Sequence, residues 1–90
     1  MAKKTYILGT AIKITSVISI DDPDSVLIKI TDPIDSVKVN DANMTPQTNN
    51  VYHYIWQSST GGQEGFYVVE IKAKKGDYTG LSKIEFELVK

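Results

Sequence analysis

The segment Val51-Tyr52-His53-Tyr54-Ile55-Trp56-Gln57 is the stretch of this chain that decides its fold. Its three aromatic residues alternate, so Tyr52, Tyr54 and Trp56 share one face of an extended strand. The residues between and after them form a more polar face, which is the poorer surface for a core. We therefore expect the aromatic face to point inward, with its polar tips at the core margin. An exposed platform on which sugar rings stack is the alternative for the same three side chains.

Similar alternation of apolar and polar residues recurs along the chain. It covers Ser25–Thr31, Phe66–Lys74 and Ile84–Leu88, and it is less regular between residues 11 and 20 and around residues 37–40. Turn residues separate these segments about every eight to twelve positions. Residues 41–50 read as a polar loop with Met44 reaching the core, and residues 75–80 read as a turn. The pattern predicts an all-β, two-sheet antiparallel sandwich of six to seven strands.

Size and composition limit what the protein does. The chain has 90 residues, of which 41% are apolar and 23% charged, and we interpret residues 1–90 as a single domain. A chain of this length leaves little core for an internal catalytic pocket. Its net charge is -1 and its basic residues are all lysine, which argues against nucleic acid as a partner because base and phosphate recognition favour arginine. No apolar stretch is long enough for membrane insertion.

Cysteine is absent, so the domain has no disulfide and no thiolate metal site. The apolar run that follows Lys3 and Lys4 is too short for the core of a signal peptide. We therefore expect either a cytoplasmic or virion-associated protein, or a module excised from a longer exported surface protein. These two alternatives remain open.

The order of the motifs resembles one group of domains. A strand, the Asp32-Pro33 turn, a short strand, Met44-Thr45, the segment 51–57 and Gln63-Glu64-Gly65-Phe66-Tyr67-Val68-Val69 together look like prokaryotic and phage immunoglobulin-like modules. Such modules are similar to fibronectin type III and macroglobulin-like domains, and the resemblance runs from about Ile12 to Leu88. It implies an immunoglobulin-like fold and a role in binding, spacing or decoration. The stretch Gly65-Phe66-Tyr67 resembles a tyrosine corner, in which the tyrosine hydroxyl bonds back to nearby backbone.

Aspartate is concentrated in the first half of the chain. Within residues 21–41 it occupies six positions, namely Asp21, Asp22, Asp24, Asp32, Asp35 and Asp41. Loops at one end of a sandwich could gather such oxygens around Ca²⁺. Aspartate is also a common turn former, and two of the six precede proline. We favour turn chemistry and expect no cofactor, with calcium as the weaker alternative.

No catalytic residue is predicted, and we expect that the protein is not an enzyme. His53 is the only histidine, and no nucleophile, base and orienting group can be assembled around it. Without cysteine, one histidine does not make a zinc site. On the face opposite the aromatic residues, we expect His53 to be exposed.

Apolar residues on the outer faces of strands are the remaining candidates for function. The possible interaction surface consists of His53, Ile55, Leu27 and Val68. Open sheet edges are a second candidate surface, because they can pair with another chain. The sequence therefore favours a structural or interaction module that spaces, decorates or docks within a cell-surface or virion assembly, through protein partners or self-association. The alternative is a carbohydrate-binding module that stacks sugars on tyrosine or tryptophan.

Overall fold

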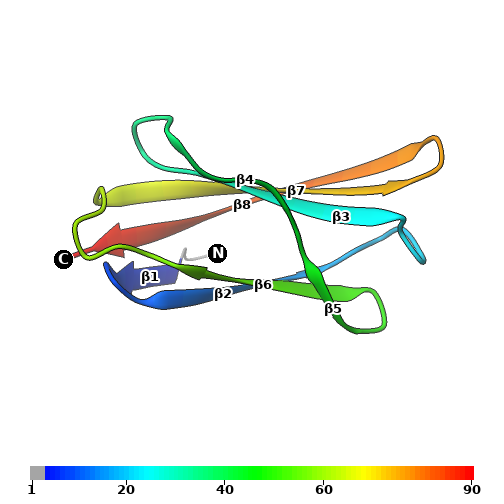
Figure 1. The fold of residues 1–90 in the computed structure, drawn as a ribbon, viewed down its shortest axis with the longest axis horizontal. Coiled ribbons are helices and arrows are strands. Elements are labelled where there is room, and N and C mark those ends of the chain that lie inside the picture. The colour runs from blue at the N-terminus through cyan, green and yellow to red at the C-terminus, as the bar shows by residue number, and fades with distance from the viewer. Residues whose placement is uncertain (1–3) are drawn as a thin grey trace.

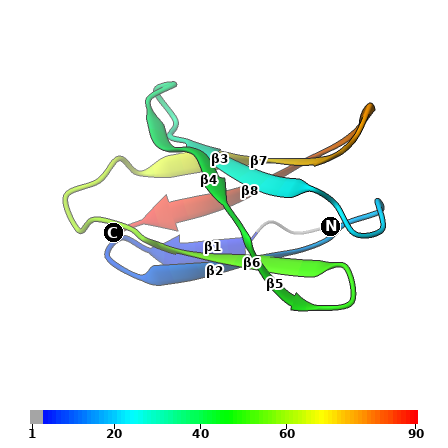
Figure 2. The same ribbon diagram turned by 45° about the vertical axis from the view of Figure 1, so that its right-hand side comes forward.

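A computed structural model describes residues 4–90 as two β-sheets packed face to face, with no helix among those residues (Figure 1). The larger sheet has the strand order β1-β8-β7-β3-β4 and the smaller one β2-β6-β5. The two layers remain distinct when the molecule is turned (Figure 2), and its extents are 41 × 24 × 24 Å. The strands are β1 Lys4–Ile7, β2 Ala11–Val17, β3 Ser25–Thr31, β4 Val37–Asn43, β5 Thr45–Thr48, β6 Val51–Gln57, β7 Gly65–Lys75 and β8 Tyr78–Val89.

The prediction of an all-β protein with two sheets is confirmed, but the strand count is higher than predicted. Residues 4–90 form eight strands instead of six to seven. Strand β1 was not predicted, because four residues are too few to show alternation. It pairs in parallel with the end of β8, with Lys4 beside Phe86 and Ile7 beside Val89. The expectation of purely antiparallel pairing is therefore wrong for this one pair.

The prediction of a loop at residues 41–50 is wrong. Strand β4 continues to Asn43, the chain then crosses between the sheets at Met44, and β5 follows immediately. Met44 is buried, as predicted. Every side chain of β5 is exposed, so no alternation marks it as a strand. Pro46 is tolerated there because β5 is an edge strand, where a missing N–H breaks no ladder.

The hairpin between β7 and β8 is longer than the sequence indicated. Lys75 pairs with Tyr78, so the turn consists of Gly76 and Asp77 alone. Gly76 has a φ of 55°, which glycine adopts without steric cost. The segment 75–80, which we expected to be a turn, is therefore mostly strand. The two strands run for 11 and 12 residues and carry the hairpin tip to one end of the molecule (Figure 1).

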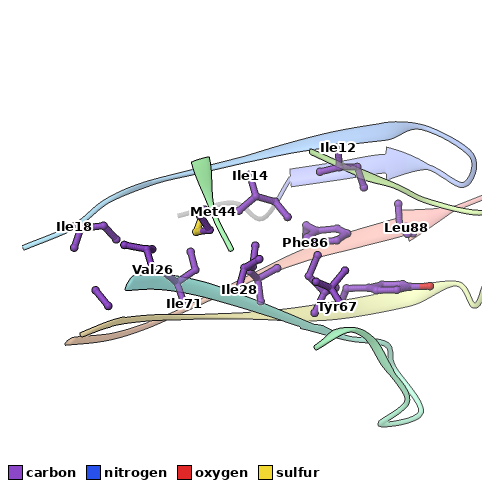
Figure 3. Close-up of a cluster of buried hydrophobic side chains, with 14 of the residues drawn as sticks. Ile12, Ile14, Ile18, Val26, Ile28, Met44, Tyr67, Ile71, Phe86 and Leu88 are labelled. Carbon is purple, nitrogen blue, oxygen red and sulfur yellow. The ribbon is translucent and has the colours of Figure 1, made fainter. Parts of the chain in front are cut away.

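The core lies between the two sheets and is built from the predicted inner faces. Buried residues of β3 and β7 face those of β2, while Met44, Phe86 and Leu88 complete the cluster (Figure 3). Ile84 is an exception to the prediction for the last strand, since it is 42% exposed. Its part of β8 lies before the stretch that β1 covers.

Aromatic rings fill one part of this core. The Phe86 ring stacks on Tyr67 with centroids 5.5 Å apart, and Trp56 lies 5.6 Å from Tyr67. Tyr6 of β1 meets the Phe86 ring edge-on at 5.9 Å. Trp56 is the one ring of this cluster that comes from the smaller sheet, so its contacts with Tyr67 and Phe86 link the two sheets, and aromatic pairs add stability beyond the area that they bury.

Candidate functional site

The four residues of the predicted interaction surface do not gather on one face. His53 and Ile55 belong to β6 in the smaller sheet, whereas Leu27 and Val68 belong to β3 and β7 in the larger one. Ile55 is 60% exposed, as an outer position should be. Because the sheets pack through their inner faces, the two pairs lie on opposite sides of the molecule.

Neither pair forms a continuous apolar patch. Leu27 and Val68 are separated on the outer face by the cross-strand neighbours Lys29 and Glu70. Ile55 lies beside Lys13 of β2, and Gln57 and Thr15 are further exposed polar positions near it. Charged side chains on an outer sheet face discourage further sheet packing. The surface predicted from strand parity is therefore divided and partly charged.

His53 is less exposed than the sequence suggested. It lies between Thr15 of β2 and Thr45 of β5, and its side chain is half-buried. Its Nδ1 is a buried side-chain atom without a hydrogen-bond partner within residues 4–90. The middle position in a three-stranded sheet explains this burial, because neighbours on both sides cover the ring.

The aromatic residues of β6 do not form an exposed platform. Tyr52, Tyr54 and Trp56 are half-buried and pack against the core from the inner face, as the primary prediction stated. Trp56 contacts Tyr67 and Phe86 through its ring. A sugar cannot stack on the faces of all three rings in this arrangement. Tyr52 also lines a surface cleft.

Tyr67 holds the loop between β6 and β7 in place. Its hydroxyl donates a hydrogen bond of 2.6 Å to the carbonyl of Gln63, four residues upstream. The side chain is almost completely buried, so the phenol ring also contributes to the core. This geometry is that of a tyrosine corner, and it agrees with the prediction for Gly65-Phe66-Tyr67.

The hydroxyl of Tyr67 makes stability depend on pH in the alkaline range. Burial raises its pKa above the ordinary value of 10.0, and the negative charge of Asp32 raises the pKa further. Because the folded protein binds this proton more tightly than the unfolded chain, the contribution is complete below a pH of about 10 and is lost at higher pH. We expect the free energy of unfolding to fall more steeply in the wild type than in Tyr67→Phe above this pH. Urea denaturation of both proteins at several alkaline pH values measures this, and parallel declines would contradict it.

Five of the six aspartates are distributed between the two ends of the sandwich, and Asp41 lies within β4. Asp21, Asp22 and Asp24 lie in the β2–β3 loop, while Asp32 and Asp35 lie in the β3–β4 loop at the other end of β3. No group of three or more histidine, cysteine or acidic side chains within residues 4–90 is arranged to hold a metal ion.

Two of these aspartates accept hydrogen bonds from backbone N–H groups of turns. The Asp32 carboxylate accepts hydrogen bonds from the backbone N–H groups of Ile34 and Ser36, at 3.0 and 2.8 Å. It is buried and has Lys38 3.6 Å away as a counter-charge. The Asp24 carboxylate accepts a bond from the Gly76 N–H at the hairpin tip. Asp32 therefore has the turn role that the sequence favoured, whereas Asp24 joins the β2–β3 loop to the tip of the β7–β8 hairpin.

Three loops meet at the end of the molecule that carries Asp21. The N–H of Ile18 donates to the Asn50 carbonyl at 2.7 Å, and the Asn50 amide donates to the Asp21 carboxylate at 2.8 Å. Lys75 donates to the Asp21 carbonyl at 3.0 Å. These bonds join the β2–β3 loop to the β5–β6 turn on one side and to the β7–β8 hairpin on the other.

An open cleft of about 690 Å³ lies between two of these loops. Its lining comes from the β2–β3 loop and from the β5–β6 hairpin, and its members are Asp21, Asp22, Pro46, Gln47, Thr48, Asn49, Asn50 and Tyr52. Sequence reasoning missed it, because its two walls lie more than twenty residues apart in the chain. The only sequence signal was the clustering of amides around Pro46.

Strand β8 has an edge that is paired only in part. β1 covers the stretch from Phe86 to Val89, and residues 78–84 have no neighbouring strand on that side among residues 4–90. The exposed apolar residues of this stretch are Tyr78, Leu81 and Ile84, at 75%, 76% and 42% exposure. An open edge with apolar side chains is a site where another strand can add.

Comparisons with known proteins provide no assignment, since no family model, curated protein or solved structure matches the chain. The part of the chain that the structure describes contains no helix able to cross a membrane.

Proposed function

We propose that this chain is an immunoglobulin-like module without enzymatic activity, which spaces, decorates or docks within a cell-surface or virion assembly. Two sheets with repeated crossings between them support this proposal, as does the hydrogen bond from Tyr67 to Gln63. The single observation that carries an assembly role is the open edge of β8. We assign its occupant as the same edge of a second copy.

The open edge presents main-chain groups that can continue the sheet. The Leu8 N–H donates to the Val89 carbonyl at 2.8 Å, so the backbone of Val89 faces the side of β1. Main-chain groups alternate in direction along a strand, and the register between β7 and β8 has no shift. The N–H and C=O groups of Leu81 and Lys83 therefore point toward the open edge.

The apolar side chains of this edge are spaced symmetrically. Tyr78 and Ile84 lie three positions before and after Leu81. In an antiparallel pair of two β8 edges centred on Leu81, this residue meets its own counterpart. Tyr78 of each copy then lies opposite Ile84 of the other, on the inner face. All three exposed apolar residues of the edge find apolar partners in one register.

Charge both favours and opposes this register, because Glu85 lies directly opposite Asp77 of the other copy and like charges in such positions are destabilising. Lys83 lies opposite Thr79 of the other copy, one same-face position away from the other copy's Asp77. Opposite charges at such diagonal positions stabilise strand pairs. A single strand pair buries less area than a standard interface, so we expect a dissociation constant of roughly tens of micromolar to millimolar.

Sedimentation velocity over a range from micromolar to millimolar protein tests this proposal. We expect reversible dimers in the wild type, and at least about tenfold weaker association in Leu81→Lys, because two lysines would meet on the symmetry axis. Leu81→Pro should have the same effect, since it removes an N–H that points to the open edge. Leu81 is exposed, so neither change should unfold the protein.

Ile55→Lys is the matched control, because Ile55 is an exposed aliphatic residue on the outer face of the other sheet. It should dimerise as the wild type does. A wild type that stays monomeric at millimolar concentration would overturn the proposal. Dimers that tolerate Leu81→Lys, or that Ile55→Lys disrupts instead, would overturn it as well.

A further inference from the structure

The cleft between the β2–β3 loop and the β5–β6 hairpin has the composition of a binding site for a neutral, hydroxyl-rich ligand. The β2–β3 loop and the β5–β6 hairpin lie at the same end of the molecule (Figures 1 and 2). The volume of about 690 Å³ lies within the range typical of small-molecule sites. We propose that this cleft binds an oligosaccharide. The proposal is independent of the β8 edge, because no residue of β7 or β8 lines the cleft.

The polar groups of the cleft match the chemistry of sugar hydroxyls. A hydroxyl both donates and accepts, and side-chain amides do the same through separate atoms. The lining provides three such amides, on Gln47, Asn49 and Asn50, together with the carboxylates of Asp21 and Asp22. Carboxylates accept strong hydrogen bonds from hydroxyl donors.

An apolar surface is also present. Tyr52 and Pro46 line the cleft from neighbouring strands and lie directly opposite each other in the β5–β6 pairing. Flat aromatic and proline rings can pack against the C–H faces of a sugar. Tyr52 is fixed from behind, since it packs against the core. The cleft therefore combines a rigid apolar wall with polar groups that can select the orientation of the hydroxyls.

The walls are held in place before any ligand binds. The bonds from Ile18 to Asn50 and from Asn50 to Asp21 fix the distance between the two loops. Asp22 and Asn50 both adopt a positive φ, at 46° and 56°. Preorganised groups lose little conformational freedom on binding, so an open cleft of this kind can still bind a ligand.

Other ligand classes fit the cleft less well. Within residues 4–90 the lining has two carboxylates and no lysine, which disfavours phosphates and other anions. Only two lining residues carry a charge, which is fewer than a calcium site generally uses. A cationic amine is the main competitor, because it is attracted to Asp21 and Asp22. Spermidine represents such amines in the titration described next.

A titration followed by two-dimensional ¹H–¹⁵N NMR identifies both the ligand and its site. The probes are maltohexaose, cellohexaose, mannohexaose and chitohexaose, with spermidine and calcium chloride as separate arms. We expect saturable shifts of the backbone amides of residues 47–50 and 21–22 with at least one oligosaccharide, at a dissociation constant of roughly 1 mM. Calcium and spermidine should leave these amides unchanged or compete only weakly.

Variants decide whether the cleft itself binds. The double variant Gln47→Ala with Asn49→Ala should weaken binding at least about fivefold, since each change removes hydrogen bonds to the ligand. Tyr52→Leu should weaken it about tenfold by removing the flat ring. Gln47 and Asn49 are exposed, so the double variant remains informative even if Tyr52→Leu lowers stability. Asn40→Ala is the matched control, because Asn40 is an exposed asparagine on β4 outside the cleft.

The result that would overturn the proposal is equally specific. If none of the four oligosaccharides binds, or if the shifts occur elsewhere and persist in the double variant, the cleft is not a sugar site. Saturable shifts of residues 47–50 with spermidine or calcium alone would instead assign it to cations. If the wild type binds a sugar but does not dimerise, the cleft proposal stands and the β8 edge proposal fails. If it dimerises but binds no sugar, the opposite holds.

Discussion

Gly65→Ala is expected to destabilise the protein by about 3 kcal/mol, which is a large fraction of the stability of a domain of this size. Gly65 begins β7 with a φ of 128°, a conformation that side chains other than glycine rarely adopt. A Cβ atom placed there would lie 2.8 Å from Cγ and 3.1 Å from Cβ of Pro33. The proline ring cannot rotate away. Backbone strain and a steric clash therefore add together.

Gly76→Ala is the control for this prediction. Gly76 also has a positive φ, at 55°, but a Cβ atom there would meet no atom within 4 Å. Only the backbone cost remains, so we expect a loss of about 1 kcal/mol. Urea denaturation of the two variants measures both values, with the free energy of unfolding falling at the same slope against urea concentration in each. Equal losses would show that the contact with Pro33 contributes nothing.

Phe86→Ala is expected to cost about 4 kcal/mol in the free energy of unfolding. Phe86 is 4% exposed and contacts three other rings, those of Tyr6, Trp56 and Tyr67. Truncation leaves a cavity where the two sheets and β1 meet, and the surrounding rigid rings cannot easily fill it. Because Trp56 is the only tryptophan, its fluorescence reports on the same position, and we expect its emission to shift to longer wavelength.

Phe66→Ala provides a matched comparison within the same hairpin. Phe66 lies on the outer face of β7 and is 48% exposed, so its truncation leaves no enclosed cavity. We expect a loss of no more than about 1 kcal/mol and an unchanged emission from Trp56. A loss for Phe86→Ala as small as that for Phe66→Ala would mean that the aromatic cluster does not join the sheets.

The inner faces of the long strands could be predicted from the sequence, because successive side chains of a strand point to opposite faces of the sheet. Val26, Ile28 and Ile30 alternate with half-buried positions and are all buried in the structure. The same rule failed where pairing depends on distant partners. Strand β1 is defined by its parallel neighbour β8, and β5 is defined by β6, since neither has a pattern of its own. Local alternation carries no information about such edges.

The candidate sites were harder to predict for a related reason. The alternation of inner and outer positions along each strand placed Ile55 and Leu27 correctly on outer faces. It could not show that these faces belong to different sheets. The symmetric spacing of Tyr78, Leu81 and Ile84 is visible in the sequence. It acquires meaning only when this part of β8 is known to have no neighbouring strand among residues 4–90. The cleft requires the spatial approach of two loops, which hydrogen bonds to Asn50 produce.

The parallel pairing of β1 with β8 has a mechanical consequence. A pulling force applied at Lys4 and at the end of β8 acts in opposite directions along two neighbouring strands that run the same way. Such a load shears the hydrogen bonds between them, and those bonds must break together rather than one after another. The edge-on contact between the Tyr6 and Phe86 rings adds resistance to the separation of the same two strands. Under tension, this short strand would act as a clamp for the whole sandwich.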